Sequence, residues 1–220
     1  MGMSQYSEQL EDLTHIRSMM ERSTRFVSLS GMTGIAIGII AMIAAAIVFI
    51  IAKTGPFQSP DIFWEYAKNF TGEHNRLDKA NLFLFFLAAA TLVSSIIVGL
   101  MLTVQKTKKN GLKLWSKSFR LMLLNIAIPL GAGGIFCLIL INLGQAQMVA
   151  GSMLVFYGLS LINGAKYTLQ DVNSLGLIEI ILGLITLWMN KYGIEMWAIG
   201  FGILHIIYGA KIYFTQKDNE

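Results

Sequence analysis

A run of 22 residues without a single charge, residues 31–52, constrains the fold more than any other feature of the sequence. At a rise of 1.5 Å per residue, a helix of this length spans roughly 33 Å, which is about the thickness of the hydrocarbon core of a bilayer. Arg17, Arg22 and Arg25 precede the run and would hold its near end at one membrane surface. The sequence therefore predicts a membrane-spanning helix at 31–52.

Five more apolar segments have the same character. Only 14% of the 220 residues are charged, whereas soluble domains average about 25%. The six predicted spans cover residues 31–52, 82–104, 121–143, 148–165, 174–189 and 194–214. We therefore expect an all-α fold: a polytopic membrane helical bundle of six transmembrane helices, arranged as three hairpins, over residues 31–214.

The segment 1–30 before the first span predicts an amphipathic helix. Its apolar stripe recurs at steps of three and four residues and consists of Tyr6, Leu10, Leu13, Ile16 and Met20. Such a helix can lie in the plane of an anionic leaflet or dock a protein partner. It can also pack against the protein's own inner face, which is the more common use of such a stripe.

The one long polar connection, 53–80, is predicted to contain a short interfacial helix over 60–69. Ser59 and Pro60 form an N-cap signal, and Phe63, Trp64 and Tyr66 are aromatic residues of the kind enriched at membrane interfaces. At the other terminus, residues 215–220 are expected to form a short polar tail.

Basic residues are distributed unevenly between the two predicted sides of the membrane. The connection between the second and third spans contains no acid over 105–120, and its basic residues are Lys106, Lys108, Lys109, Lys113, Lys117 and Arg120. Such a segment can bind anionic lipid or nucleic acid, but in a membrane protein it is typical of a topology signal, so we expect no nucleic acid. With six spans, 12 of the 17 Lys and Arg fall on the side of both termini, which predicts cytoplasmic termini.

Glycines recur seven residues apart, which places each pair on one helix face. The pairs are Gly31/Gly38, Gly151/Gly158, Gly176/Gly183, Gly193/Gly200 and Gly202/Gly209. In lipid, small residues let helix backbones approach closely. The pattern predicts tight packing of the first, fourth, fifth and sixth spans, and it equally suits a homo-oligomer formed through glycine-lined faces.

The segment from Met20 to Gly31, MERSTRFVSLSG, runs into a glycine-spaced span. In this respect the chain resembles uncharacterised six-span integral membrane proteins common in Bacteroidota. Its three hairpins of glycine-framed spans are more distantly similar in arrangement to HdeD-type acid-resistance membrane proteins, although the long N-terminal segment and the 53–80 loop depart from them. Both resemblances imply a bacterial inner membrane, and neither supplies a catalytic or binding motif.

The third span contains a proline. Pro129 removes one helical hydrogen bond and crowds the carbonyl of Asn125. Gly131, Gly133 and Gly134 follow within one turn. These five residues predict a kink or an interruption of the third span.

Two ionisable residues fall inside predicted spans, Glu179 in the fifth and His205 in the sixth. They lie at nearly equal distance from the turn at 190–193, so an antiparallel pair would place them at one depth. Gly183 and Gly202 are expected to share their faces and to direct both toward the helix seam. A charge at this depth is costly without a partner. The pair is either a proton-linked or substrate-binding site, or a polar clasp that holds the two helices together.

No nucleotide-binding, metal-binding or hydrolytic motif is present in the sequence. We therefore expect no metal, no cofactor and no enzymatic activity; an intramembrane enzyme with His205 as base would lack a nucleophile. The favoured interpretation is a small membrane protein with a structural, accessory or stress-response role. The alternative is a small transporter or channel that uses the Glu179/His205 pair and a kinked third span.

Overall fold

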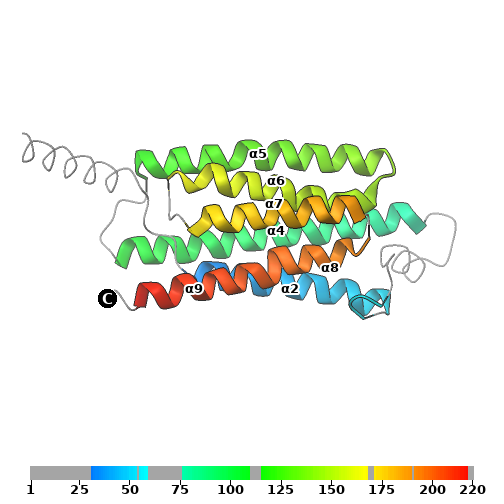
Figure 1. Ribbon diagram of the computed structural model, residues 1–220, viewed down its shortest axis with the longest axis horizontal. Helices are drawn as coiled ribbons and strands as arrows, with labels where there is room; N and C mark the ends of the chain where they lie inside the picture. Colours follow the sequence, from blue (N-terminus) through cyan, green and yellow to red (C-terminus); the bar gives the residue numbers. More distant parts are fainter. Residues whose placement is uncertain are drawn as a thin grey trace, which may run out of the picture.

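The computed structural model describes residues 31–53, 55–58, 76–109, 115–167, 171–189 and 191–217 (Figure 1). The elements in this part of the chain are α2 (Gly31–Ala52), α4 (Arg76–Lys109), α5 (Lys117–Asn142), η1 (Ala146–Met148), α6 (Val149–Ala165), α7 (Asp171–Met189), α8 (Gly193–Trp197), η2 (Ala198–Leu204) and α9 (His205–Lys217). The predicted amphipathic segment 1–30 and the predicted interfacial helix 60–69 lie outside the described residues.

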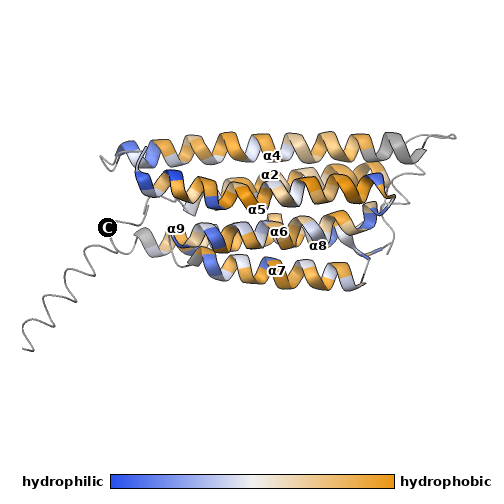
Figure 2. Ribbon diagram, turned by 90° about the horizontal axis from the view of Figure 1, so that it is seen from above, coloured by the Kyte–Doolittle hydropathy of each residue, from blue (hydrophilic) through white to orange (hydrophobic). Residues whose placement is uncertain are grey.

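Six helical segments are long and apolar enough to cross a membrane, the sixth being α8, η2 and α9 in succession. The prediction of an all-α, six-span bundle is therefore confirmed. Large apolar side chains cover the outside of the bundle: Ile50 is 74% exposed and Ile128 is 71% exposed. Figure 2 shows the apolar residues along the helices and the polar ones gathered mainly at their ends. Such a surface suits lipid, and the chain is a multi-pass membrane protein.

The helix boundaries follow the predictions closely for α2 and less closely for α4. The first helix covers Gly31–Ala52 as predicted, whereas α4 begins six residues before the predicted start and ends five residues after the predicted end. Its additional residues are mainly polar and charged, and such side chains can continue a helix beyond the hydrocarbon core. The polar loop is correspondingly shorter than predicted, and α9 likewise continues three residues into the predicted tail.

The six spans pack as two groups of three. In the first group α6 lies between α5 and α7, and in the second α2 lies between α4 and the sixth span. The first two predicted hairpins, α2 with α4 and α5 with α6, are well packed. The third is not: α7 packs chiefly on α6, the sixth span packs chiefly on α2, and these two spans touch each other only sparsely. The predicted hairpin of the fifth and sixth spans is thus the most loosely packed of the three.

Each group is held together by a glycine seam. Between α6 and α7, a Cβ on Gly158 or Gly176 would collide with the other's backbone carbonyl, and Gly151 and Gly183 approach each other in the same way. Between α2 and the sixth span, Gly31 packs on Gly209. The heptad glycines are thus used inside one chain. A homo-oligomer remains a prediction and would need another surface.

The third span does not break at its proline. The helix α5 continues through Pro129 as one α-helix from Lys117 to Asn142, with Ser116 as its N-cap. The predicted interruption is therefore wrong, and a kink within the continuous helix stays a prediction. The departure from α-helical geometry lies in the sixth span instead, where Ala198–Leu204 is a π-helix.

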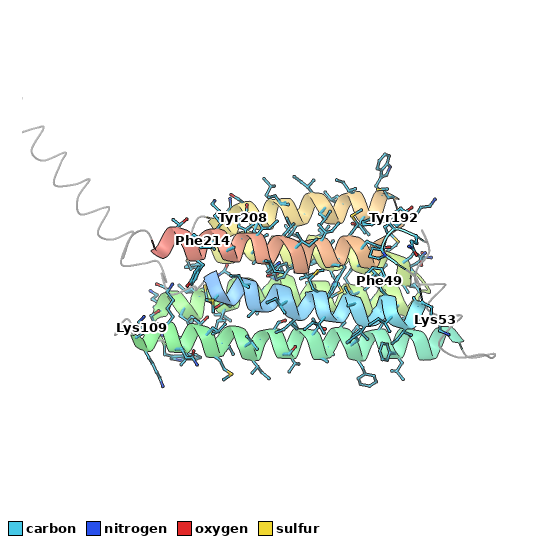
Figure 3. The ribbon with its side chains drawn as sticks, turned by 90° about the horizontal axis from the view of Figure 1, so that it is seen from below. Phe49, Lys53, Lys109, Tyr192, Tyr208 and Phe214 are labelled. Carbon is cyan, nitrogen blue, oxygen red and sulfur yellow. The ribbon has the colours of Figure 1, made fainter. Side chains whose placement is uncertain are left out.

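Lysine and aromatic side chains mark both ends of the bundle. Figure 3 shows Lys53 and Tyr192 at one end, and Lys109 and Phe214 at the other. Aromatic and lysine side chains of this kind suit the interface between lipid and water. The two ends therefore define the two membrane surfaces.

Candidate functional site

The only acid and the only histidine in the middle of the described spans meet where the two helix groups touch. Glu179 of α7 is fully buried, and His205 at the start of α9 is 4% exposed. The distance from His205 Nδ1 to Glu179 Oε1 is 3.6 Å. The predicted proximity of the two side chains is confirmed by this distance.

His205 makes two hydrogen bonds, and neither goes to Glu179. Its Nε2 lies 2.7 Å from the hydroxyl of Tyr157 on α6, and its Nδ1 lies 3.0 Å from the carbonyl oxygen of Gly200. A carbonyl only accepts, so we assign the imidazole hydrogen to Nδ1. Nε2 is then an acceptor for the Tyr157 hydroxyl. The imidazole is satisfied in its neutral form.

Glu179 is not satisfied. Both carboxyl oxygens are buried without a hydrogen-bond partner. The 3.6 Å separation from His205 Nδ1 is too long for a hydrogen bond. Burying a carboxyl group without donors is costly, and more so if it is ionised. The two side chains are therefore close but not directly hydrogen-bonded to each other.

Gly200 makes room for the carboxyl group. A Cβ at this position would collide with Glu179 Oε2 and with the side chain of Leu154. Gly200 also belongs to the π-helix Ala198–Leu204. Single turns of π-helix occur frequently at functional sites, because they expose backbone groups that an α-helix would pair.

Two aromatic rings, Phe201 and Tyr157, flank the imidazole, and Trp197 packs on Phe201. Trp197, Phe201 and His205 follow one another along the sixth span, with ring centroids 5.2 Å and then 6.1 Å apart. Phe201 and His205 are nearly parallel at 18°. The ring of Tyr157 lies 4.8 Å from Phe201 and so closes the cluster from α6.

Equal distance from the turn predicted this contact correctly, and both side chains are buried away from lipid as expected, but the two glycines lie in other seams. Gly183 packs against Gly151 on α6, and Gly202 packs against Met42 on α2. Two residues that complete the site, Tyr157 and Gly200, were not predicted. For Tyr157 a signal was present, because this hydroxyl lies in the middle of the predicted span 148–165.

The residues predicted to form a hinge in the third span do not join this site. The side-chain amide of Asn125 donates to Leu121 O within its own helix, at 2.8 Å. Gly131 and Gly134 face open space, and Gly133 packs on Phe156. In the described structure they contact neither Glu179 nor His205.

The predicted basic residues gather at one end of the bundle. Lys108 and Lys109 end α4, and Lys117 and Arg120 begin α5; all four are exposed. The expected basic connection is therefore mostly two helix ends. The other predicted basic residues, Arg17, Arg22, Arg25 and Lys113, lie outside the described part of the chain, and Lys106 is half-buried.

A second buried carboxyl group lies at the opposite end. Glu195 of α8 is 2% exposed, and its Oε1 accepts a hydrogen bond from the Phe57 amide at 3.2 Å. The rings of Phe57 and Tyr192 lie 5.5 Å apart. Unlike Glu179, Glu195 is tied to the backbone, here that of the segment following α2.

The described residues contain no group of three or more His, Cys, Asp or Glu side chains that could hold a metal ion. Comparisons with protein-family models, with curated proteins and with solved structures find no match to this chain. The functional argument therefore rests on the geometry of the Glu179 site.

Proposed function

We propose that this chain is a small transporter driven by or coupled to protons, with Glu179 as the proton-binding group. The observation that carries the proposal is a fully buried carboxyl group without a hydrogen-bond partner, close to a histidine. Ionisable groups inside membrane spans are rare, and they mark substrate and ion pathways and proton relays.

The position of the site supports this function. Glu179 lies near the middle of Val172–Met189, and His205 lies at the middle of Gly193–Thr215. Transport sites lie near the bilayer midplane between groups of helices, beside helices that depart from regular geometry. A clasp, by contrast, would be expected to close its hydrogen bond, because the polar groups of a structural pair are normally satisfied.

The test is proton-coupled flux into proteoliposomes loaded with a pH-sensitive dye and energised by a pH gradient. Wild-type protein should give a proton flux that saturates as the pH gradient is raised and that exceeds the flux of empty liposomes. Glu179→Gln should lose at least nine-tenths of this proton flux while remaining folded. Glu195→Gln is the matched control, because it changes another buried carboxyl group outside the site. Equal flux in wild type and Glu179→Gln, or none in wild type, would contradict the proposal.

A structural, accessory or stress-response role is the second candidate, and the two glycine seams favour it. Backbones packed through Gly158 and Gly176, and through Gly31 and Gly209, suit a compact scaffold. The docking element would be the amphipathic N-terminal segment. Deleting residues 4–28 should then abolish complex formation while the spans still insert, as measured by native electrophoresis of membrane extracts. Unchanged complexes would count against this role.

We further propose an inner-membrane location with both termini in the cytoplasm. The excess of Lys and Arg on the side of the termini supports this orientation. The exposed basic helix ends would then meet anionic lipid headgroups. A cysteine at Ser59 should label with an impermeant thiol reagent in intact inner-membrane spheroplasts. Labelling only after the membrane is opened would reverse the orientation.

A further inference from the structure

We infer that His205 is a proton-controlled switch in the sixth span. When Glu179 carries a proton, the Nδ1–H of His205 bonds to the carbonyl of Gly200. When Glu179 is ionised, the same N–H stays on the imidazole but donates its hydrogen bond to the carboxylate. The carbonyl of Gly200 then loses this bond, and the π-turn is released. This inference rests on the proposed function and names how proton binding changes the shape of the protein.

Two acceptors lie within reach of one donor. His205 Nδ1 is 3.0 Å from Gly200 O and 3.6 Å from Glu179 Oε1. A charge-assisted hydrogen bond to a carboxylate is shorter and about twice as strong as a neutral one. Closing the longer distance requires a movement of only about 0.8 Å. A negative charge on Glu179 is therefore enough to change which acceptor is preferred.

Tyr157 makes this exchange possible without a second proton. Its hydroxyl lies 2.7 Å from His205 Nε2 and donates to it. The single hydrogen of the neutral imidazole is thus kept on Nδ1, which faces both acceptors. Tyr157 acts as a positioning residue, and the ring can turn slightly about this contact.

The exchange affects the backbone because of where the two residues lie. Gly200 belongs to the π-helix Ala198–Leu204 and His205 adjoins it. The backbone N–H of His205 bonds to the Gly202 carbonyl, whereas the imidazole of His205 bonds to the Gly200 carbonyl. The side-chain bond therefore helps to keep the Gly200 carbonyl in the π arrangement. Once released, this carbonyl can accept the α-helical partner four residues on. Since the carbonyl of His205 packs on Gly34 of α2, the change links Glu179 of the first helix group to α2 in the second.

Few other ionisable groups surround Glu179 in the described structure. The helix α6 contributes Tyr157 and α9 contributes His205, whereas the sequences of α2 and η2 contain no ionisable side chain. On α7 itself the other acid is Asp171, two turns away, and the acid of α8, Glu195, is bonded to Phe57. His205 is thus the donor that responds to a charge on Glu179.

The test is solid-state NMR of the full chain in bilayers during a pH titration. Nitrogen labelling of the three histidines reports Nδ1, and the His205 signal is the one lost in His205→Gln. Carbonyl-labelled glycine with nitrogen-labelled phenylalanine selects Gly200, because the Gly-Phe pair occurs once in the sequence. Both signals should shift together as the pH rises in wild type. They should stay constant in Glu179→Gln and shift as in wild type in Glu195→Gln.

Two outcomes would overturn the switch: constant signals in wild type throughout the titration, or the same shifts in Glu179→Gln. The wild-type titration decides even if the Gln variant does not fold. Flux measured on the same preparations separates the two claims. Shifts without flux would keep the switch and reject transport, whereas flux without shifts would keep transport and reject the switch.

Discussion

The third and sixth spans both depart from the regular pattern of α-helical hydrogen bonds, and the comparison between them is instructive. The third span carries Pro129, which has no N–H, yet α5 remains one α-helix. The sixth span contains no proline, yet it includes the π-helix Ala198–Leu204. The residue type that usually breaks a helix left it continuous, and a segment without that residue type changed its geometry.

Their surroundings account for the difference. Around the proline, α5 is largely open, with Ile128 71% exposed and Gly131 and Gly134 facing open space. No close contact at these positions would stabilise a change of helix geometry. The π-helix is packed between α2 and α7, and its glycines lie against Glu179 and Met42. Tertiary contacts, and not local propensity, determine where the backbone departs from an α-helix.

The largest expected contrast between the spans comes from filling a glycine. Gly209→Leu should destabilise the protein by about 3 kcal/mol, because every near neighbour of the new Cβ is backbone on α2. Gly134→Leu on α5 meets nothing within 4 Å and should change the stability by less than about 0.5 kcal/mol. Unfolding in detergent by a denaturing surfactant measures both. Equal losses would show that the two spans are packed alike.

A smaller contrast comes from removing a polar side chain. His205→Leu removes two hydrogen bonds, one of which joins the sixth span to α6, and should cost about 1–2 kcal/mol. Asn125→Leu removes one bond within α5 and should cost about 0.5 kcal/mol or less. The same unfolding assay applies. A larger loss for Asn125→Leu would place the structural polar group in the third span.

The proline itself should matter still less. Pro129→Ala restores a donor for the Asn125 carbonyl in an already continuous helix, so we expect stabilisation of at most about 1 kcal/mol. Proteoliposome flux should stay within about twofold of wild type. Loss of flux in a Pro129→Ala variant with an intact fold would support the predicted hinge in this span.

The smallest effect is expected on the outer face of α5. Ile128→Leu exchanges one lipid-facing apolar side chain for another and should change the stability by less than about 0.3 kcal/mol. The unfolding midpoint should therefore not move measurably. A clear shift would mean that this face is covered by another protein surface in the membrane.

The fold was largely predictable because its main determinant is local. Long uncharged runs must be helical in lipid, and the first helix, Gly31–Ala52, matched its predicted bounds. Which helix packs on which was less accessible. The glycine pairs predicted close contacts for four spans, but they did not reveal that Gly31 would meet Gly209 and not a partner in a neighbouring span.

The site was predictable in depth but not in detail. Counting residues from a short turn placed Glu179 and His205 at one level, since the rise of a helix is constant. The direction in which a side chain points depends on the rotation of its helix about its axis. A π-turn changes this rotation, and the residue types in the sequence do not predict where a π-turn occurs. For that reason Gly202 was assigned to the wrong seam, and Tyr157, which comes from another helix, was missed.

The seam between Gly31 and Gly209 also sets an order of events during biosynthesis. The first span leaves the ribosome long before its partner exists: roughly 165 residues separate the ends of α2 and α9, which is about 8–30 s of translation. Until the sixth span is made, the glycine face of α2 is unpacked and only α4 lies beside this helix. The contact between α2 and the sixth span therefore forms last, and a chain that stalls before Gly193 would lack this contact.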